Sequence, residues 1–196
     1  MDTQDRVREV SRFLILTPHR DALKPLEAYR RGLFAAGFPG AYSFPLAAPL
    51  AAVSRPFSRQ ELKELGRNIR GVTVIREEIS QKFQSTGSSL VQCSPFSFLG
   101  VLLDFPLEKA LFPQAAREKL LAVPPFPALC AALVRPGEET CVHEKAPPLS
   151  FRAASVANLT VRPLPCGGRG YSFEWNSGPP VWLAKNLKPQ RGGLGN

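Results

Sequence analysis

Histidine and cysteine, which often act as bases, nucleophiles or metal ligands, are sparse in this chain of 196 residues, with two histidines and four cysteines. The histidines and cysteines are His19, His143, Cys93, Cys130, Cys141 and Cys166. His19 follows an apolar run in the sequence TPHR, where its imidazole could line a cleft and exchange a proton near neutral pH. A histidine in a loop or at a helix start more often has a structural role, so both interpretations of His19 stay open.

Cys130 lies in the apolar run FPALCAALVRPG and is the residue of that run that could carry a reaction. It could act as a nucleophile if a neighbouring cation such as Arg135 lowered the pKa of its thiol. The alternative is a small buried hydrophobic residue, because free cysteines are among the most buried residue types.

A zinc site is the other chemistry that the cysteines suggest. It would need about four ligands, and the available set is Cys130, Cys141, His143 and Cys166. No recognised spacing relates these residues and the sequence has no CxxC pair. We therefore expect reduced thiols, no bound metal and no cofactor.

The net charge of +9 is the strongest compositional signal. A basic surface raises the local concentration of anionic partners such as RNA, nucleotides or acidic proteins. Arg135, Arg162 and Lys185 are the candidates for binding an anion, because cationic side chains donate charge-assisted hydrogen bonds to phosphate oxygens. The basic residues are scattered along the chain, which equally suits a role in solubility.

Alternating strands and helices must position these groups. The first half predicts a strand at 12–17, a helix from Asp21 to about Ala36 that ends at Gly37 and Gly40, and a strand at 44–53. The tetrad Ser58-Arg59-Gln60-Glu61 then has the pattern of a capping box, so we expect a helix from there to Gly71.

The second half predicts more strands and a terminal hairpin. In order, we expect a strand at 72–75, a loop at 81–89, a strand at 96–105, a helix at 113–121, a strand at 126–134, a polar loop at 136–148, and a hairpin formed by 151–161 and 171–175. In this hairpin Tyr171, Phe173 and Trp175 alternate, which favours one buried strand face over a surface for stacking bases.

Three segments carry a family resemblance: RFLILTPHRD, FPLAAPLAAVSRPFSRQEL and FPALCAALVRPG. Their order and spacing resemble the 2H phosphoesterase family, which includes bacterial 2′-5′ RNA ligase-like cyclic phosphodiesterases. The resemblance implies two pseudo-symmetric strand-helix-strand lobes with antiparallel sheets around a central cleft. In that family each lobe presents a His-x-Thr motif, and the two histidines act as general base and general acid on a 2′,3′-cyclic phosphate or a related phosphodiester.

This sequence departs from the family at both motifs. The second motif would fall on residues 130–135, which retain Leu133 and Arg135, and the first near residues 48–50, to within about two residues. The histidine and threonine positions are then occupied by Ala48, Leu50, Cys130 and Ala132. We expect these four residues to line the cleft without acid or base, so the ancestral hydrolysis would be lost.

Together these observations predict an α+β protein with a single bilobal domain at 1–185 and a flexible basic tail at 186–196. The expected function is non-catalytic binding of RNA, a nucleotide or another phosphorylated ligand in a basic cleft. One alternative is an active 2′,3′-cyclic phosphodiesterase or RNA ligase-like enzyme that uses His19 or Cys130 instead. Another is a scaffold that binds a protein partner through an exposed apolar loop at 83–98. We expect a cytoplasmic location, because no apolar segment is long enough to span a bilayer and residues 1–12 are charged rather than signal-like. We also expect a monomer.

Overall fold

The computed structural model describes residues 10–18, 20–73, 85–93, 96–103, 105–134, 154–164 and 171–182. The strands are β1 (Ser11–Pro18), β2 (Ala48–Val53), β3 (Ser85–Cys93), β4 (Phe96–Leu103), β5 (Leu120–Ala122), β6 (Ala128–Val134), β7 (Ala154–Pro163) and β8 (Tyr171–Trp182). The helices are α1 (Arg20–Ala35) and α2 (Arg59–Thr73), with short 3-10 helices η1 (Pro39–Tyr42), η2 (Lys109–Leu111) and η3 (Gln114–Lys119). The α+β class is therefore confirmed.

The strands form two antiparallel sheets. The larger sheet has the order β5-β2-β1-β7-β8, and the smaller has the order β3-β4-β6. In the larger sheet β1 lies between β2 and β7, and in the smaller sheet β4 lies between β6 and β3, with every pair antiparallel. The arrangement β2-β1-β7 therefore has the same strand directions as β6-β4-β3.

Both β2 and β6 contain a one-residue bulge. The register between β1 and β2 slips at Leu50, which has no partner in β1, and the register between β4 and β6 slips at Ala131, which has no partner in β4. A bulge leaves one residue unpaired and increases the local twist of the strand. Register shifts also occur in the β2–β5, β3–β4 and β7–β8 pairs, so such irregularities are not confined to these two strands.

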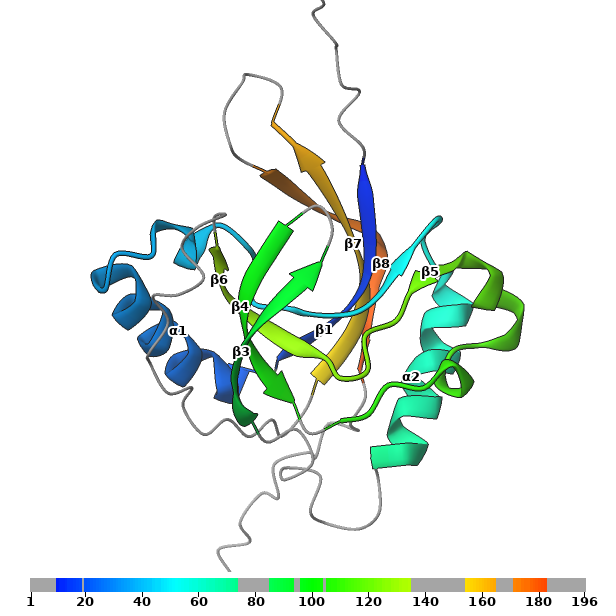
Figure 1. The fold of residues 1–196 in the computed structure, drawn as a ribbon. Coiled ribbons are helices and arrows are strands. Elements are labelled where there is room, and N and C mark those ends of the chain that lie inside the picture. The colour runs from blue at the N-terminus through cyan, green and yellow to red at the C-terminus, as the bar shows by residue number, and fades with distance from the viewer. Residues whose placement is uncertain are drawn as a thin grey trace, which may run out of the picture.

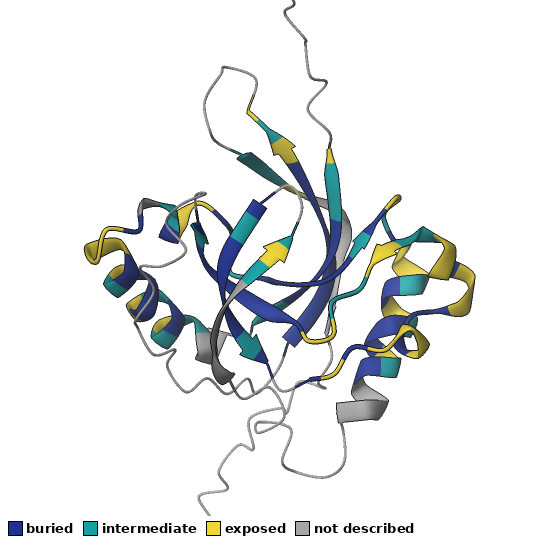
Figure 2. Cartoon of the chain, viewed as in Figure 1, coloured by how far each residue is buried: buried dark blue, intermediate teal, exposed yellow. Residues whose placement is uncertain are grey.

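Two amphipathic helices lie on opposite sides of the sheets (Figure 1). In α1 the side chains of Leu26, Tyr29 and Leu33 are buried, which is the spacing of one helix face. Gly37 ends this helix with φ +95°, a left-handed conformation that glycine adopts without steric cost. Figure 2 shows the buried faces of α1 and α2 turned towards the sheets.

The predicted capping box is present at the start of α2. The backbone N–H of Glu61 donates to Ser58 Oγ at 3.2 Å, and the backbone N–H of Ser58 donates to the Glu61 carboxylate. Neither α1 nor α2, the α-helices of the described segments, is long and apolar enough to cross a membrane.

An aromatic cluster joins the two sheets. The ring of Phe44, just before β2, lies 5.0 Å from the ring of Phe96 in β4 and 5.0 Å from the ring of Phe173 in β8, measured between centroids. Phe13 of β1 also contacts Phe96, with centroids 5.8 Å apart. Because these rings come from both sheets, the sheets share a core and the space between them is largely filled.

Three local predictions are wrong. The predicted loop at 81–89 overlaps β3, whose first residues are polar or glycine and which forms a strand by pairing with β4. The predicted helix at 113–121 is replaced by η3 and β5. The strand expected at 72–75 is wrong at its start, because α2 continues to Thr73. The other predicted strands are confirmed, although β2 begins at Ala48 rather than at residue 44, and so are both remaining helices and the β7–β8 hairpin pairing. The loop predicted at 136–148 and the tail at 186–196 lie outside the described residues.

Candidate functional site

The strands proposed to carry the two motifs contact each other in the structure. The backbone N–H of Cys130 in β6 donates to the carbonyl oxygen of Ala47, immediately before β2, at 3.1 Å. This hydrogen bond crosses from the smaller sheet to the larger one. Two segments about eighty residues apart in the sequence therefore meet where the sheets approach each other.

The four residues expected to line a cleft are instead fully enclosed. Ala48, Leu50, Cys130 and Ala132 each have 0% of their surface exposed. They pack into the core between the sheets and the helices. The prediction that these side chains line an open cleft is therefore wrong, and the reason is that their small apolar groups allow close packing where charged groups would require solvent or partners.

The thiol of Cys130 is unreactive in this environment. Burial raises the pKa of its thiol well above the ordinary value, and this effect outweighs the opposing influence of the Arg30 guanidinium. The thiol is consequently protonated at neutral pH and out of reach of a substrate, whereas a nucleophilic cysteine acts as an accessible thiolate. The interpretation of Cys130 as a small buried hydrophobic residue accounts for these features.

The cation near Cys130 is Arg30, which the sequence analysis did not single out. Arg30 is 4% exposed, and its Nε donates to the carbonyl oxygen of Ala131 at 3.1 Å. A terminal nitrogen of the same guanidinium donates to the carbonyl oxygen of Phe44, and burial lowers the pKa of Arg30. Arg30 lies one turn from Leu26 and three residues before Leu33, on the same face of α1. This spacing is the sequence feature that could have predicted its burial.

Arg30 acts as a clamp on the bulge in β6. Ala131 is the residue that has no partner in β4, and Arg30 supplies a donor to its carbonyl oxygen. The guanidinium also lies 5.8 Å from the ring centroid of Tyr42 in η1. These contacts hold α1, η1 and β6 together. Arginine keeps its charge at neutral pH, but the guanidinium of Arg30 is occupied by these contacts and is not available to a ligand.

Of the three predicted anion-binding residues, the structure describes Arg162. Its Nε donates to Glu174 Oε2 at 3.1 Å, across the β7–β8 pair, and both side chains are about half exposed. A phosphate would have to compete with this carboxylate for the guanidinium. Arg135, Lys185 and His19 lie outside the described residues.

The zinc hypothesis is not tested, because Cys141, His143 and Cys166 also lie outside the described residues. Within the part of the chain that the structure describes, no three His, Cys, Asp or Glu side chains are grouped so as to hold a metal ion. The thiols of Cys93 and Cys130 are free of disulfides.

The exposed apolar loop expected at 83–98 is also wrong for its described part. Residues 85–93 form β3, and Phe96 and Phe98 of β4 are only 8% and 1% exposed. These phenylalanines belong to the aromatic cluster between the sheets. They are therefore core residues and offer no surface to a protein partner.

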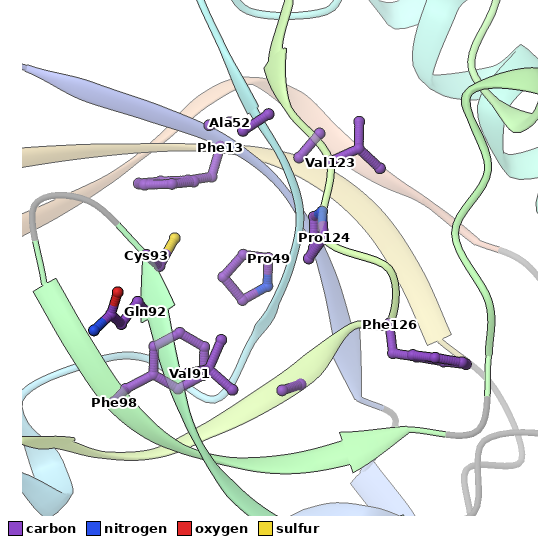
Figure 3. A pocket seen from close by; sticks show the side chains of 13 residues that line it. Phe13, Pro49, Ala52, Val91, Gln92, Cys93, Phe98, Val123, Pro124 and Phe126 are labelled. Carbon is purple, nitrogen blue, oxygen red and sulfur yellow. The ribbon is translucent and has the colours of Figure 1, made fainter. Parts of the chain in front are cut away.

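The open space near the motif strands is an apolar pocket of about 240 Å³. Figure 3 shows Phe13 and Phe98 on opposite sides of this pocket, with Cys93 and Pro124 on the other two sides. The thirteen lining residues come from both sheets and from the β5–β6 connection, and they are Phe13, Pro49, Ala51, Ala52, Val91, Gln92, Cys93, Phe98, Ala122, Val123, Pro124, Phe126 and Ala128.

The polar side chains of the pocket are those of Gln92 and Cys93, both from β3. Burial raises the pKa of the Cys93 thiol to about 11, so this group is uncharged at neutral pH. The pocket therefore presents aromatic and aliphatic walls, one amide and one protonated thiol. This lining can bind apolar groups by contact but offers no charged group for acid–base chemistry.

Comparisons of the chain with protein-family models, with curated proteins and with solved structures found no match.

Proposed function

We propose that this chain is a non-catalytic protein with the 2H phosphoesterase plan, which binds RNA, a nucleotide or another phosphorylated ligand. One observation carries the proposal. The two candidate motif strands contact each other between the sheets, and the side chains at the motif positions are small and apolar. Such an arrangement keeps the scaffold of a paired-histidine site while lacking the groups that would move protons.

The alternating strand directions of the two sheets are compatible with the 2H plan. The units β2-β1-β7 and β6-β4-β3 have the same directions, and each motif strand is bulged at one residue. Placing the bulges at Leu50 and Ala131 in equivalent positions pairs residues 49–51 with residues 130–132. The first motif then shifts by one residue, from 48–50 to 49–51. Its histidine and threonine positions are then occupied by Pro49 and Ala51, which both line the pocket.

The absence of acid–base groups at these positions argues against hydrolysis by the family's route. Transfer of a proton to and from a phosphodiester requires two groups that titrate near neutral pH. Pro49 and Ala51 cannot titrate, and the buried Cys130 thiol stays protonated. The alternative of an active enzyme therefore depends on His19 alone among the substitutes considered.

The net charge of +9 supports an anionic ligand. None of the lining residues of the apolar pocket carries a charge. A phosphate placed there would lose its hydration without gaining a partner, which is strongly unfavourable. The phosphate of the ligand would therefore be bound outside this pocket, by basic side chains such as Arg135.

Fluorescence anisotropy with a labelled short RNA and with labelled mononucleotides tests the proposal. We expect binding at about 50 mM salt that weakens by about tenfold at 200 mM salt, because each phosphate contact releases counterions. Arg135→Ala is expected to weaken binding more than Arg67→Ala, a matched loss of one exposed charge on α2. Absence of binding in all conditions would refute the proposal.

A second assay separates binding from catalysis. The protein is incubated with a 2′,3′-cyclic nucleotide, and the linear products are followed by chromatography. We expect no turnover above the rate without protein. Turnover that His19→Ala abolishes would show an active phosphodiesterase and would overturn the non-catalytic assignment.

A further inference from the structure

We propose that the apolar pocket binds one uncharged bicyclic ring and discriminates against the same ring when a phosphate is attached directly to it. The proposal concerns the pocket alone and does not rest on the phosphate-binding function proposed above. The two are compatible, since a nucleotide carries its phosphate several bonds from its base.

The volume of the pocket sets the size of the ligand. A cavity of about 150 Å³ lined by apolar side chains is known to hold one benzene ring. The pocket has a volume of about 240 Å³, which exceeds that of the benzene site by roughly the space of a second fused ring. A larger ring system would have to protrude into solvent.

The walls favour a flat aromatic ligand. Phe13 and Phe98 are each 1% exposed, so packing fixes their rings on opposite sides of the pocket (Figure 3). Phe126, on the β5–β6 connection, is 47% exposed and lies at the pocket edge. Aromatic rings attract one another in offset and edge-to-face contacts. A ring that enters the pocket can therefore contact the exposed ring of Phe126, while Phe13 and Phe98, which are almost fully buried, form fixed walls.

Small residues create this space. Ala51, Ala52 and Ala128 line the pocket where larger apolar side chains would fill it, although protein interiors are otherwise closely packed. Gly100 adjoins the same wall, and a Cβ atom there would lie 2.7 Å from the Cβ of Ala128 and 3.0 Å from Cε2 of Phe98. The wall is thus close-packed behind the pocket, while the pocket side is left open.

The lining also explains the expected discrimination against charge. The thirteen lining residues include no Asp, Glu, Lys, Arg or His, and the Cys93 thiol is protonated at neutral pH. The amide of Gln92 can form one hydrogen bond to a hydroxyl or a ring nitrogen. It cannot replace the hydration shell of a phosphate dianion.

The test compares 2-naphthol with 2-naphthyl phosphate, which present the same two fused rings with and without charge. Dissociation constants are measured at pH 7 by titration, following amide shifts in two-dimensional NMR spectra of the labelled full chain. We expect 2-naphthol to bind about tenfold or more tightly than 2-naphthyl phosphate. Equal affinities measured from the amides of the pocket residues, or tighter binding of the phosphate at those amides, would refute the proposal.

Two pairs of variants locate the site. Ala52→Leu fills the pocket, and Ala35→Leu makes the same change at an exposed position of α1. Phe126→Ala removes the ring at the pocket edge, and Phe34→Ala removes a similarly exposed ring of α1, which is 56% exposed. We expect each pocket variant to weaken 2-naphthol binding by about tenfold, with the controls unchanged.

Phe126→Ala keeps the test decisive if Ala52→Leu fails to fold, because a half-exposed ring contributes little to the core. Binding of 2-naphthol that is unchanged in Phe126→Ala would place the ligand elsewhere and overturn the proposal. Binding of 2-naphthol without any RNA or nucleotide binding would leave this inference standing and refute the proposed function. The reverse outcome would refute this inference and leave the proposed function intact.

Discussion

Asn158 ties β7 to the start of α2, and its replacement tests how the larger sheet holds this helix. Asn158 is 2% exposed, and its side-chain amide pairs with the backbone of Phe57, which precedes the Ser58 cap. Asn158 Nδ2 donates to the Phe57 carbonyl oxygen at 2.8 Å, and the Phe57 N–H donates to Asn158 Oδ1 at 2.9 Å. The side chain thus satisfies both backbone groups of one buried residue.

Asn158→Leu keeps the branching at Cγ and the number of side-chain heavy atoms, and it removes both hydrogen bonds. A buried donor or acceptor without a partner costs about 1–3 kcal/mol. Because Phe57 is 0% exposed, water cannot take over the lost bonds. Two orphaned groups therefore predict a loss of about 2–6 kcal/mol in the free energy of unfolding, and a fall in Tm of about 2–4 °C for each kcal/mol.

The assay is urea unfolding followed by far-ultraviolet circular dichroism, with the free energy extrapolated to water. Asn68→Leu is the control, because half-buried Asn68 donates one hydrogen bond, to the carbonyl oxygen of Leu111 at 2.7 Å. We expect this control to lose about 1 kcal/mol. If Asn158→Leu cost no more than Asn68→Leu, the assignment of Asn158 as the link between β7 and α2 would be refuted.

Three further predictions concern close packing and the ionisable groups. Gly40→Ala should destabilise the protein by about 1–3 kcal/mol, because the new methyl group would overlap the carbonyl oxygen of Leu133; an unchanged unfolding free energy would contradict this contact. Burial raises the pKa of Glu61, but hydrogen bonds from Lys119 and Ser58 outweigh burial and lower it below the ordinary 4.5. Wild type should therefore have a larger free energy of unfolding than Glu61→Gln at pH 7. Urea titrations at a series of pH values should show this difference disappear as the pH falls below 4.5 and through the lowered pKa. The rate at which iodoacetamide alkylates Cys93, measured by peptide mass analysis, should rise about tenfold for each pH unit between about 7 and 10. A rate that stops rising near the ordinary pKa of 9.0 would contradict a pKa of about 11.

The sequence predicts those elements whose signals are local. The strand at 12–17 ends at a proline and corresponds to β1, and the capping box at Ser58 and Glu61 forms the bonds that its pattern requires. The polar strand β3 has no such signal, because Ser85, Gly87 and Ser88 become extended by pairing with β4. Pairing of this kind is decided by tertiary context and is invisible in a single segment.

The residues predicted to line the site, Ala48, Leu50, Cys130 and Ala132, are enclosed and are not among the residues that line the pocket. The family resemblance led us to expect the segments around Ala48 and Cys130 at one cleft, and the backbones of Ala47 and Cys130 are joined by a hydrogen bond. It did not predict that their side chains would be enclosed, or that Arg30 of α1 would satisfy the bulge carbonyl of Ala131. These properties depend on which face of a bulged strand meets the opposite sheet, and a one-residue shift in register exchanges the faces.

The position of β1 between β2 and β7 has a consequence for biosynthesis. β1 pairs with β7 over its full length, from Ser11 with Val161 to Pro18 with Ala154, so its second neighbour is translated about 140 residues later. The smaller sheet is encoded entirely within residues 85–134 and can pair while the ribosome is still elongating the chain. Until the last strands emerge, one edge of β1 and its apolar residues 13–16 remain open to intermolecular pairing. A chain truncated before β7 would therefore expose that edge permanently and would be a client for chaperones rather than a folded half-protein.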